Sequence, residues 1–295
     1  MTTLASTERP VQPSPDEPRP VAPTLTVLEP PIGWQFINAR ELWRARELIF
    51  FLAWRDVKVR YKQTALGAAW AVLQPLMMMV VFTIFFGRMA GVPSGDVPYP
   101  LFALAGLLPW TFFATAVTAA GNSVIGNERL ITKIYFPRLA VPLASIGAAV
   151  VDFTVACVLL GVMMVWYRVT PGPGLLLAPL CFGLIALLAL GLGTLLAALN
   201  VAYRDFKYMI PFMMQIGMFA TPTVYMDPSA AAKGKYAWLL ALNPMTSLVA
   251  SFRSAVLGGP IPWGPLALAT FASTLAFLAG CLYFRKVEDS FADII

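Results

Sequence analysis

The sequence contains no histidine, few cysteines and little charge. Only 12% of its 295 residues are Asp, Glu, Lys or Arg, against about 25% in soluble proteins, and 59% are apolar. It has no glycine-rich phosphate loop, no clustered carboxylates and no histidine-based metal motif, and so lacks the usual sequence signals of nucleotide binding and hydrolysis. The composition therefore indicates a membrane protein rather than an enzyme.

The three cysteines, Cys157, Cys181 and Cys281, all fall in long apolar segments. An odd number of scattered thiols argues against a disulfide framework. We expect them to pack as small apolar residues, and we expect no metal site.

Long runs without charge predict how often the chain crosses a bilayer. A crossing helix needs about 17–25 mainly apolar residues, and six segments satisfy this, although Asp152 interrupts the third. We expect spans at about 66–87, 101–125, 139–167, 175–200, 209–226 and 263–284. The predicted fold class is an all-α polytopic membrane protein with six transmembrane helices.

The basic residues sort to one side of these spans. If both termini are cytoplasmic, most of the 21 Lys and Arg residues lie on the cytoplasmic side, as the positive-inside rule requires. The net charge of +6 therefore reports membrane orientation, and we expect no nucleic-acid partner.

Three regions follow along the chain: a proline-rich, disordered cytoplasmic tail at 1–38, an amphipathic interface helix at 39–62, and a six-span domain at 63–295. Disorder is expected of the tail because it has no apolar core.

The 39–62 helix has an aromatic stripe, including Trp43, Phe50 and Trp54, flanked by cations. This pattern suits a helix that lies in the headgroup layer. Leu48 and Leu52 face the other way and could meet a partner or another part of the chain. The alternative is an ordinary basic juxtamembrane helix without a partner.

The segment 227–262 is mostly apolar but broken. Asn243 and Pro244 interrupt it, and Arg253 follows, so neither part is long enough to cross. Broken backbone at membrane depth must be sheltered by protein or line a wet cavity. We expect two short re-entrant outer helices, joined near Asn243, before the sixth span.

Asp152 lies deep in a predicted span, where ionisable residues are functional by default. A proton relay needs a second acid or a histidine at similar depth, and the sequence offers none. We therefore favour a structural hydrogen bond from Asp152 to a neighbouring helix. A transporter with neither proton coupling nor a nucleotide site needs a partner that supplies energy.

The loop at 127–142 is a candidate contact for such a partner. It combines charged and apolar residues, namely Glu128, Arg129, Lys133 and Arg138 with Leu130, Ile131, Tyr135 and Phe136. A short amphipathic helix of this kind could enter a groove of a soluble protein. The alternative is a solvated turn held in the cytoplasm by its positive charge.

Four motifs in this order resemble the permease subunits of ABC-2 type exporters, most of all the branch that exports O-antigen, capsular and teichoic-acid polymers. They are "LGAAWAVLQPL" at 66–76, "LITKIYFPR" at 130–138, "NVAYRDFKYMIPFMMQIGMFATPTVY" at 200–225 and "LNPMTSLVASFRSAVLG" at 242–258. The resemblance extends from about residue 38 to the C-terminus.

The resemblance implies a homodimer in the bacterial inner membrane, two separate ATP-binding-cassette ATPase subunits and a lipid-linked glycan substrate. ATP and Mg²⁺ would be bound by the ATPase partner, and this chain would bind no cofactor. The interface helix would be 39–62 and the coupling helix 127–138. Arg204 and Asp205 match the family's inner turn, and the re-entrant helices would flank Asn243 and Pro244.

A polar glycan needs a path that satisfies its hydroxyl groups, because each one left unpaired in an apolar medium costs several kcal/mol. Aromatic side chains at a dimer interface could stack on the sugars. The candidates are Trp110, Phe112, Phe113, Phe212, Phe219 and Tyr225. Packing or a place in the interfacial belt is the alternative for each.

Other functions stay open at this point. Within the superfamily, the substrate could be a small lipid-like drug or antibiotic. From other classes, the chain could be an energy-independent lipid scramblase or a scaffold for a membrane complex. A neighbouring ATPase gene would favour an exporter.

Overall fold

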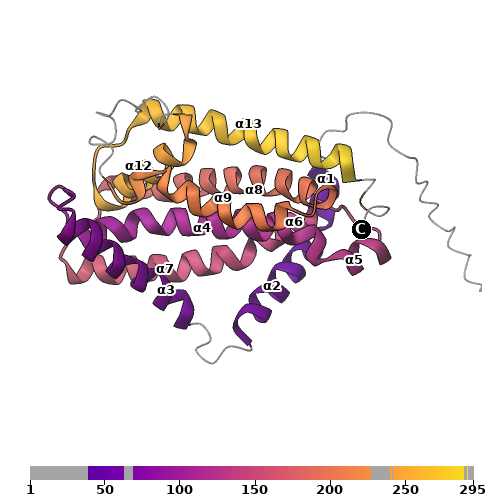
Figure 1. Ribbon diagram of the computed structural model, residues 1–295, viewed down its shortest axis with the longest axis horizontal. Helices are drawn as coiled ribbons and strands as arrows, with labels where there is room; N and C mark the ends of the chain where they lie inside the picture. The colour runs from indigo at the N-terminus through magenta and orange to yellow at the C-terminus, as the bar shows by residue number, and fades with distance from the viewer. Residues whose placement is uncertain (1–38, 63–68, 227–239, 241, 289–290, 292–295) are drawn as a thin grey trace, which may run out of the picture. The chain divides into compact units, whose positions relative to one another are not determined.

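The structure is a computed structural model that describes residues 39–62, 69–226, 240, 242–288 and 291 (Figure 1). All of them belong to the unit Gly33–Ile295. The tail predicted at 1–38 and most of the first predicted outer helix, at 227–239, lie outside these residues.

Every regular element in the described residues is helical. The α-helices are α1 (Ala39–Arg44), α2 (Arg46–Lys62), α3 (Ala69–Phe82), α4 (Tyr99–Gly126), α5 (Glu128–Lys133), α6 (Ala140–Ser145), α7 (Gly147–Trp166), α8 (Ala178–Ala202), α9 (Phe206–Phe219), α12 (Pro244–Leu257) and α13 (Trp263–Val287). A π-helical turn, η1 (Thr83–Met89), extends α3, and the 3₁₀ turns η2 (Pro173–Leu177) and η3 (Pro222–Val224) precede α8 and follow α9.

Within the described ranges, five helical segments are long and apolar enough to cross a membrane. They are Ala69–Met89, Tyr99–Gly126, Ala140–Trp166, Pro173–Ala202 and Trp263–Val287. The all-helical membrane fold is therefore as predicted, but the six-span count is not confirmed. The missing span is the one expected at 209–226, because α9 has only 14 residues. Its helix ends before Pro222, and a residue that precedes a proline is disfavoured in helical conformation.

Helix α4 forms the centre of the core. It has 28 residues, most of them buried, and it contacts α3, α7, α8, α9 and α12. In Figure 1 it runs between α7 and α8. Because apolar residues cover most of its circumference, neighbouring helices pack on it from several sides.

Helices α8 and α13 cross closely at two glycines. A Cβ added to Gly280 would lie 2.1 Å from the carbonyl oxygen of Gly191, and one added to Gly191 would lie 2.5 Å from the amide nitrogen of Phe277. Small residues let membrane helices approach until their backbones touch. The van der Waals contact between the backbones stabilises this pair.

The described helix before the last span is α12, and Asn243 caps it. The Asn243 Oδ1 atom accepts from the Met245 amide at 3.0 Å, and its Nδ2 donates to Thr221 Oγ1 at 2.9 Å. The Arg253 guanidinium stacks over the Phe102 ring at 3.8 Å and is buried. Asn243 and Pro244 therefore mark the predicted start of a short helix, while its re-entrant placement stays a prediction.

Candidate functional site

The predicted coupling loop contains a six-residue helix, α5, directly after α4. Glu128, Arg129 and Lys133 are exposed on it. Leu130, Phe136 and Arg138 are half-buried, whereas Ile131 is buried and Tyr135 is 80% exposed. The loop thus presents charge and one aromatic ring on its outer side. Its contact with an ATPase stays a prediction.

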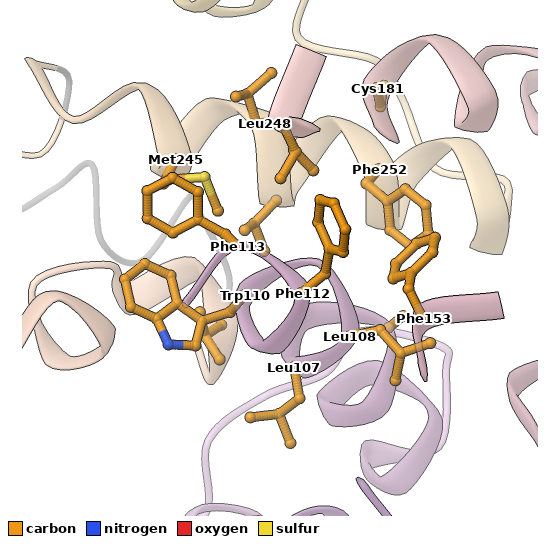
Figure 2. Close-up of a cluster of buried hydrophobic side chains, with 14 of the residues drawn as sticks. Leu107, Leu108, Trp110, Phe112, Phe113, Phe153, Cys181, Met245, Leu248 and Phe252 are labelled. Atoms are coloured by element: carbon orange, nitrogen blue, oxygen red, sulfur yellow. The ribbon is translucent and has the colours of Figure 1, made fainter. Parts of the chain in front are cut away.

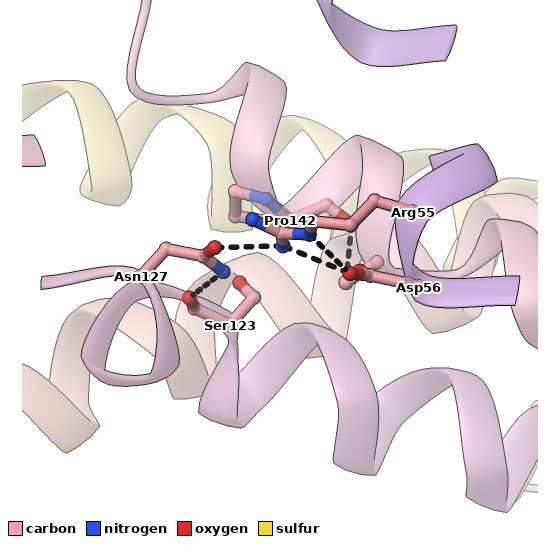
Figure 3. A network of polar contacts seen from close by, with 6 residues as sticks. Arg55, Asp56, Ser123, Asn127 and Pro142 are labelled. Carbon is pink, nitrogen blue, oxygen red and sulfur yellow. Dashed lines mark hydrogen bonds and ion pairs between the residues drawn. The ribbon is translucent and has the colours of Figure 1, made fainter. Parts of the chain in front are cut away.

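Polar contacts tie this junction to α2 (Figure 3). Arg55 Nη2 donates to Asn127 Oδ1 at 2.8 Å and pairs with Asp56 at the same distance. Asn127 Nδ2 in turn donates to the Ser123 carbonyl at 2.8 Å. Because Asn127 stands between α4 and α5, Arg55 links the predicted interface helix to the predicted coupling helix.

Helix α2 packs one face on its own chain and leaves its aromatic face open. Leu52 is buried, and Ala53 lies against Gly147 of α7. Phe50 and Trp54 remain exposed. Of the two contacts left open for Leu52, the structure shows the one within the chain.

Asp152 of α7 lies against the end of α2. Its carboxylate pairs with the Arg60 guanidinium and accepts a hydrogen bond from the Tyr61 hydroxyl. Burial, and secondarily the contact with Asp152, raises the pKa of Tyr61 to about 12, so its hydroxyl stays protonated at neutral pH. This is a contact of the predicted kind, from Asp152 to a neighbouring helix; its role in transport stays a prediction.

The six aromatic candidates fall into two groups. Trp110, Phe112 and Phe113 are at most 5% exposed and lie in the core with Phe153 and Phe252 (Figure 2). A path between two copies would be lined by exposed side chains, so this packing counts against those three.

The other three candidates come from α9 and the turn after it. Phe212 and Phe219 are 63% and 58% exposed. Tyr225 is half-buried, stacks on Phe86 with ring centroids 4.8 Å apart, and donates to the Phe219 carbonyl at 3.1 Å. Phe212 and Phe219 are therefore the candidates open to a ligand or a second copy.

The predicted inner turn lies between α8 and α9. Arg204 and Asp205 are both exposed in it. The Asp205 carbonyl accepts from the Tyr208 amide at 3.0 Å and opens α9. The pair is therefore accessible beside the start of α9.

Helix α4 also has a polar face that was not predicted from the sequence. Thr111, Thr115, Thr118 and Asn122 are half-buried there, beside cavities that Arg60 of α2 also lines. The recurrence of these residues at helical spacing is a signal that could have revealed the face.

No group of three or more His, Cys, Asp or Glu side chains within the described ranges could hold a metal ion. The fold and the site together define a multi-pass helical membrane protein with a short charged helix, α5, after its central helix. The chain belongs to the ABC-2 type transporter family, whose match covers residues 47–257.

Several curated proteins are similar over most of their length. The chain is 29% identical over 258 residues to "O-antigen export system permease protein RfbA" of Myxococcus xanthus, covering 87% of this chain and 98% of the relative. It is 26% identical over 250 residues to the protein of the same name from Klebsiella pneumoniae, covering 84% and 95%. It is 24% identical over 244 residues to "Polysialic acid transport protein KpsM" of Escherichia coli, covering 79% and 91%. The predicted resemblance to ABC-2 permeases, and within them to polysaccharide exporters, is confirmed.

Proposed function

We propose that this chain is the transmembrane subunit of an ATP-driven exporter that moves a lipid-linked polysaccharide across the bacterial inner membrane. The observation that carries the proposal is the full-length similarity to relatives named for O-antigen export and polysialic acid transport. Two copies of the chain would join two ATPase subunits, which would bind the ATP and Mg²⁺.

The contacts of the segment 206–226 support a sixth crossing. Ile210 lies against Gly121 of α4, and Gly217 lies against Trp110. Further along, the hydroxyl of Tyr99 donates to the carbonyl of Tyr225 at 3.0 Å. Helix α9 and the turn after it therefore follow α4 from Gly121 to Tyr99.

That stretch of α4 is about 33 Å long at 1.5 Å per residue, close to the roughly 30 Å of a hydrocarbon core. Although α9 is short as a helix, the segment 206–226 covers the distance of a full crossing. Six crossings would return the C-terminus to the side of the N-terminus, which the positive-inside rule places in the cytoplasm.

The Arg55 contact offers a route for coupling. An ATPase that moves α5 would also move Asn127, and Asn127 is hydrogen-bonded to Arg55 at 2.8 Å. Helix α2 then carries the displacement to α6 and α7, on which it packs. Coupling would thus reach from the cytoplasmic surface to the third span through one helix.

An exposed apolar face of α9 is the surface we assign to the second copy. It contains Tyr208, Met209, Phe212, Met213, Ile216 and Phe219. A lipid-facing surface is satisfied by aliphatic side chains, whereas aromatic rings at a dimer interface could also stack on passing sugars.

Deletion of the gene tests the proposal in cells. We expect surface polysaccharide to disappear and lipid-linked polymer to accumulate inside, with both reversed by the wild-type gene on a plasmid. Unchanged surface polymer in the deletion strain would contradict the proposal. Rapid movement of ordinary phospholipid by the purified chain alone would instead indicate a scramblase.

A further inference from the structure

Four polar side chains follow one face of α4. Thr111, Thr115, Thr118 and Asn122 recur at intervals of four, three and four residues. At 100° per residue they fall within an arc of about 60°. All four are half-buried, whereas Val117 between them is fully buried. We call these four residues the polar face of α4.

Two cavities lie along this face. The first, of 330 Å³, is lined by Thr111 and Thr115 together with Gln74, Trp70 and Asp152. The second, of 490 Å³, is a shallow depression that is widely open to the surface, and the other part of the face lines it with Pro211 and Met214 from α9. Thr115 and Arg60 line both cavities, so the two spaces adjoin at these residues.

The hydroxyl groups of this face keep capacity for a ligand. Thr111 Oγ1 donates to the Leu107 carbonyl at 2.8 Å, and Thr118 Oγ1 donates to the Ala114 carbonyl at 2.7 Å. Each hydroxyl oxygen still has acceptor lone pairs. Against hydrocarbon, these groups and the Arg60 guanidinium would lie in an unfavourable environment. A polar occupant removes that cost.

The charge of the cavities favours an uncharged polar ligand. Arg60, the cation that lines both cavities, is paired with Asp152. A phosphate would have to displace this carboxylate, whereas a sugar hydroxyl can donate to a threonine oxygen without breaking the pair. Trp70, half-exposed at the first cavity, offers a ring on which a sugar can stack.

We propose that the polar face of α4 lines the glycan path and contacts sugar hydroxyls as the polymer moves. The inference rests on the function proposed above. Successive contacts are about 4.5–6 Å apart along the helix axis. A moving chain can therefore exchange one weak hydrogen bond for the next without being held at any single site.

The test replaces hydroxyls with methyl groups. We expect the double substitution Thr115→Val and Thr118→Val to lower ATP-driven glycan export about fivefold or more, since it removes two hydrogen-bonding groups. The matched control is Thr270→Val with Thr274→Val on α13, where each threonine, like Thr118, donates to the carbonyl four residues earlier. The control should export within about twofold of wild type.

The double substitution Thr115→Ser and Thr118→Ser should retain export, because serine keeps the hydroxyl group of threonine and lacks only its methyl group. Full export by the valine variant would overturn the inference. The inference would also fail if the valine variant, but not the control variant, no longer formed a dimer, because the face would then be a protein interface. If the wild-type chain itself exports no glycan, the proposed function fails. If wild type exports and the valine variant matches it, only this inference fails.

Discussion

The crossing of α8 and α13 predicts a sharp response to a single methyl group. In Gly280→Ala the added carbon would stand 2.1 Å from the Gly191 carbonyl oxygen, well inside van der Waals contact. The opposing atom belongs to the backbone, so no side-chain rotation relieves the overlap. The helices must separate, and they lose the contact between their backbones.

The expected cost follows from overpacking, which typically destabilises a well-packed core by about 1–3 kcal/mol. Gly191→Ala should behave alike, because its Cβ would meet the Phe277 amide nitrogen at 2.5 Å. Both variants should melt at a lower temperature than wild type in detergent and give less monodisperse protein.

Two glycines on the same helices serve as matched controls. Gly183 on α8 and Gly264 on α13 have nothing within 4 Å of an added Cβ among the described residues. Alanine at either position should leave the melting temperature unchanged or raise it, because alanine has the better helix propensity. If Gly280→Ala melts like Gly264→Ala, the close crossing of α8 and α13 is wrong.

Three further perturbations address the proposed function. Asp152→Asn should leave transport largely intact but lower the melting temperature, because Arg60 loses its partner; complete loss of transport by a folded variant would favour a proton relay. Arg129→Glu combined with Lys133→Glu, both exposed on α5, should separate ATP hydrolysis from export, whereas unchanged export would remove the coupling role. The raised pKa of Tyr61, about 12 against an ordinary 10.0, implies that its contact with Asp152 is complete below pH 10 and is lost as the pH rises through 12. The difference between the ultraviolet titrations of wild type and Tyr61→Phe should be a phenolate step near pH 12; a difference step near pH 10 would contradict the raised pKa of Tyr61.

Charge and hydropathy predicted most of the membrane segments, because burying charge in lipid is costly and membrane segments therefore contain few charged residues. The segment 209–226 shows the limit of that reasoning. It carries no charge, but Pro222 interrupts its hydrogen bonding, so α9 ends at Phe219. Hydropathy measures the transfer of side chains into lipid and does not detect such an interruption of a helix.

It was harder to predict which side chains of a helix point into the core. Trp110, Phe112 and Phe113 of α4 are all apolar aromatic residues, so hydropathy alone does not tell which of them points inward. Trp110 and Phe113 are buried because other helices pack against them, and that packing depends on the whole fold. Leu52 was different, because its place opposite the aromatic stripe of α2 indicated a second contact, and the structure shows one.

The proposed function requires that this chain move glycan only when a partner hydrolyses ATP. The direct measurement places the purified chain in vesicles with its ATPase and a fluorescent lipid-linked glycan, and follows transfer across the bilayer. We predict transfer that needs both proteins and hydrolysable ATP, and that stops with a non-hydrolysable analogue. Equal transfer without the ATPase, or no transfer with it, would contradict the proposed function.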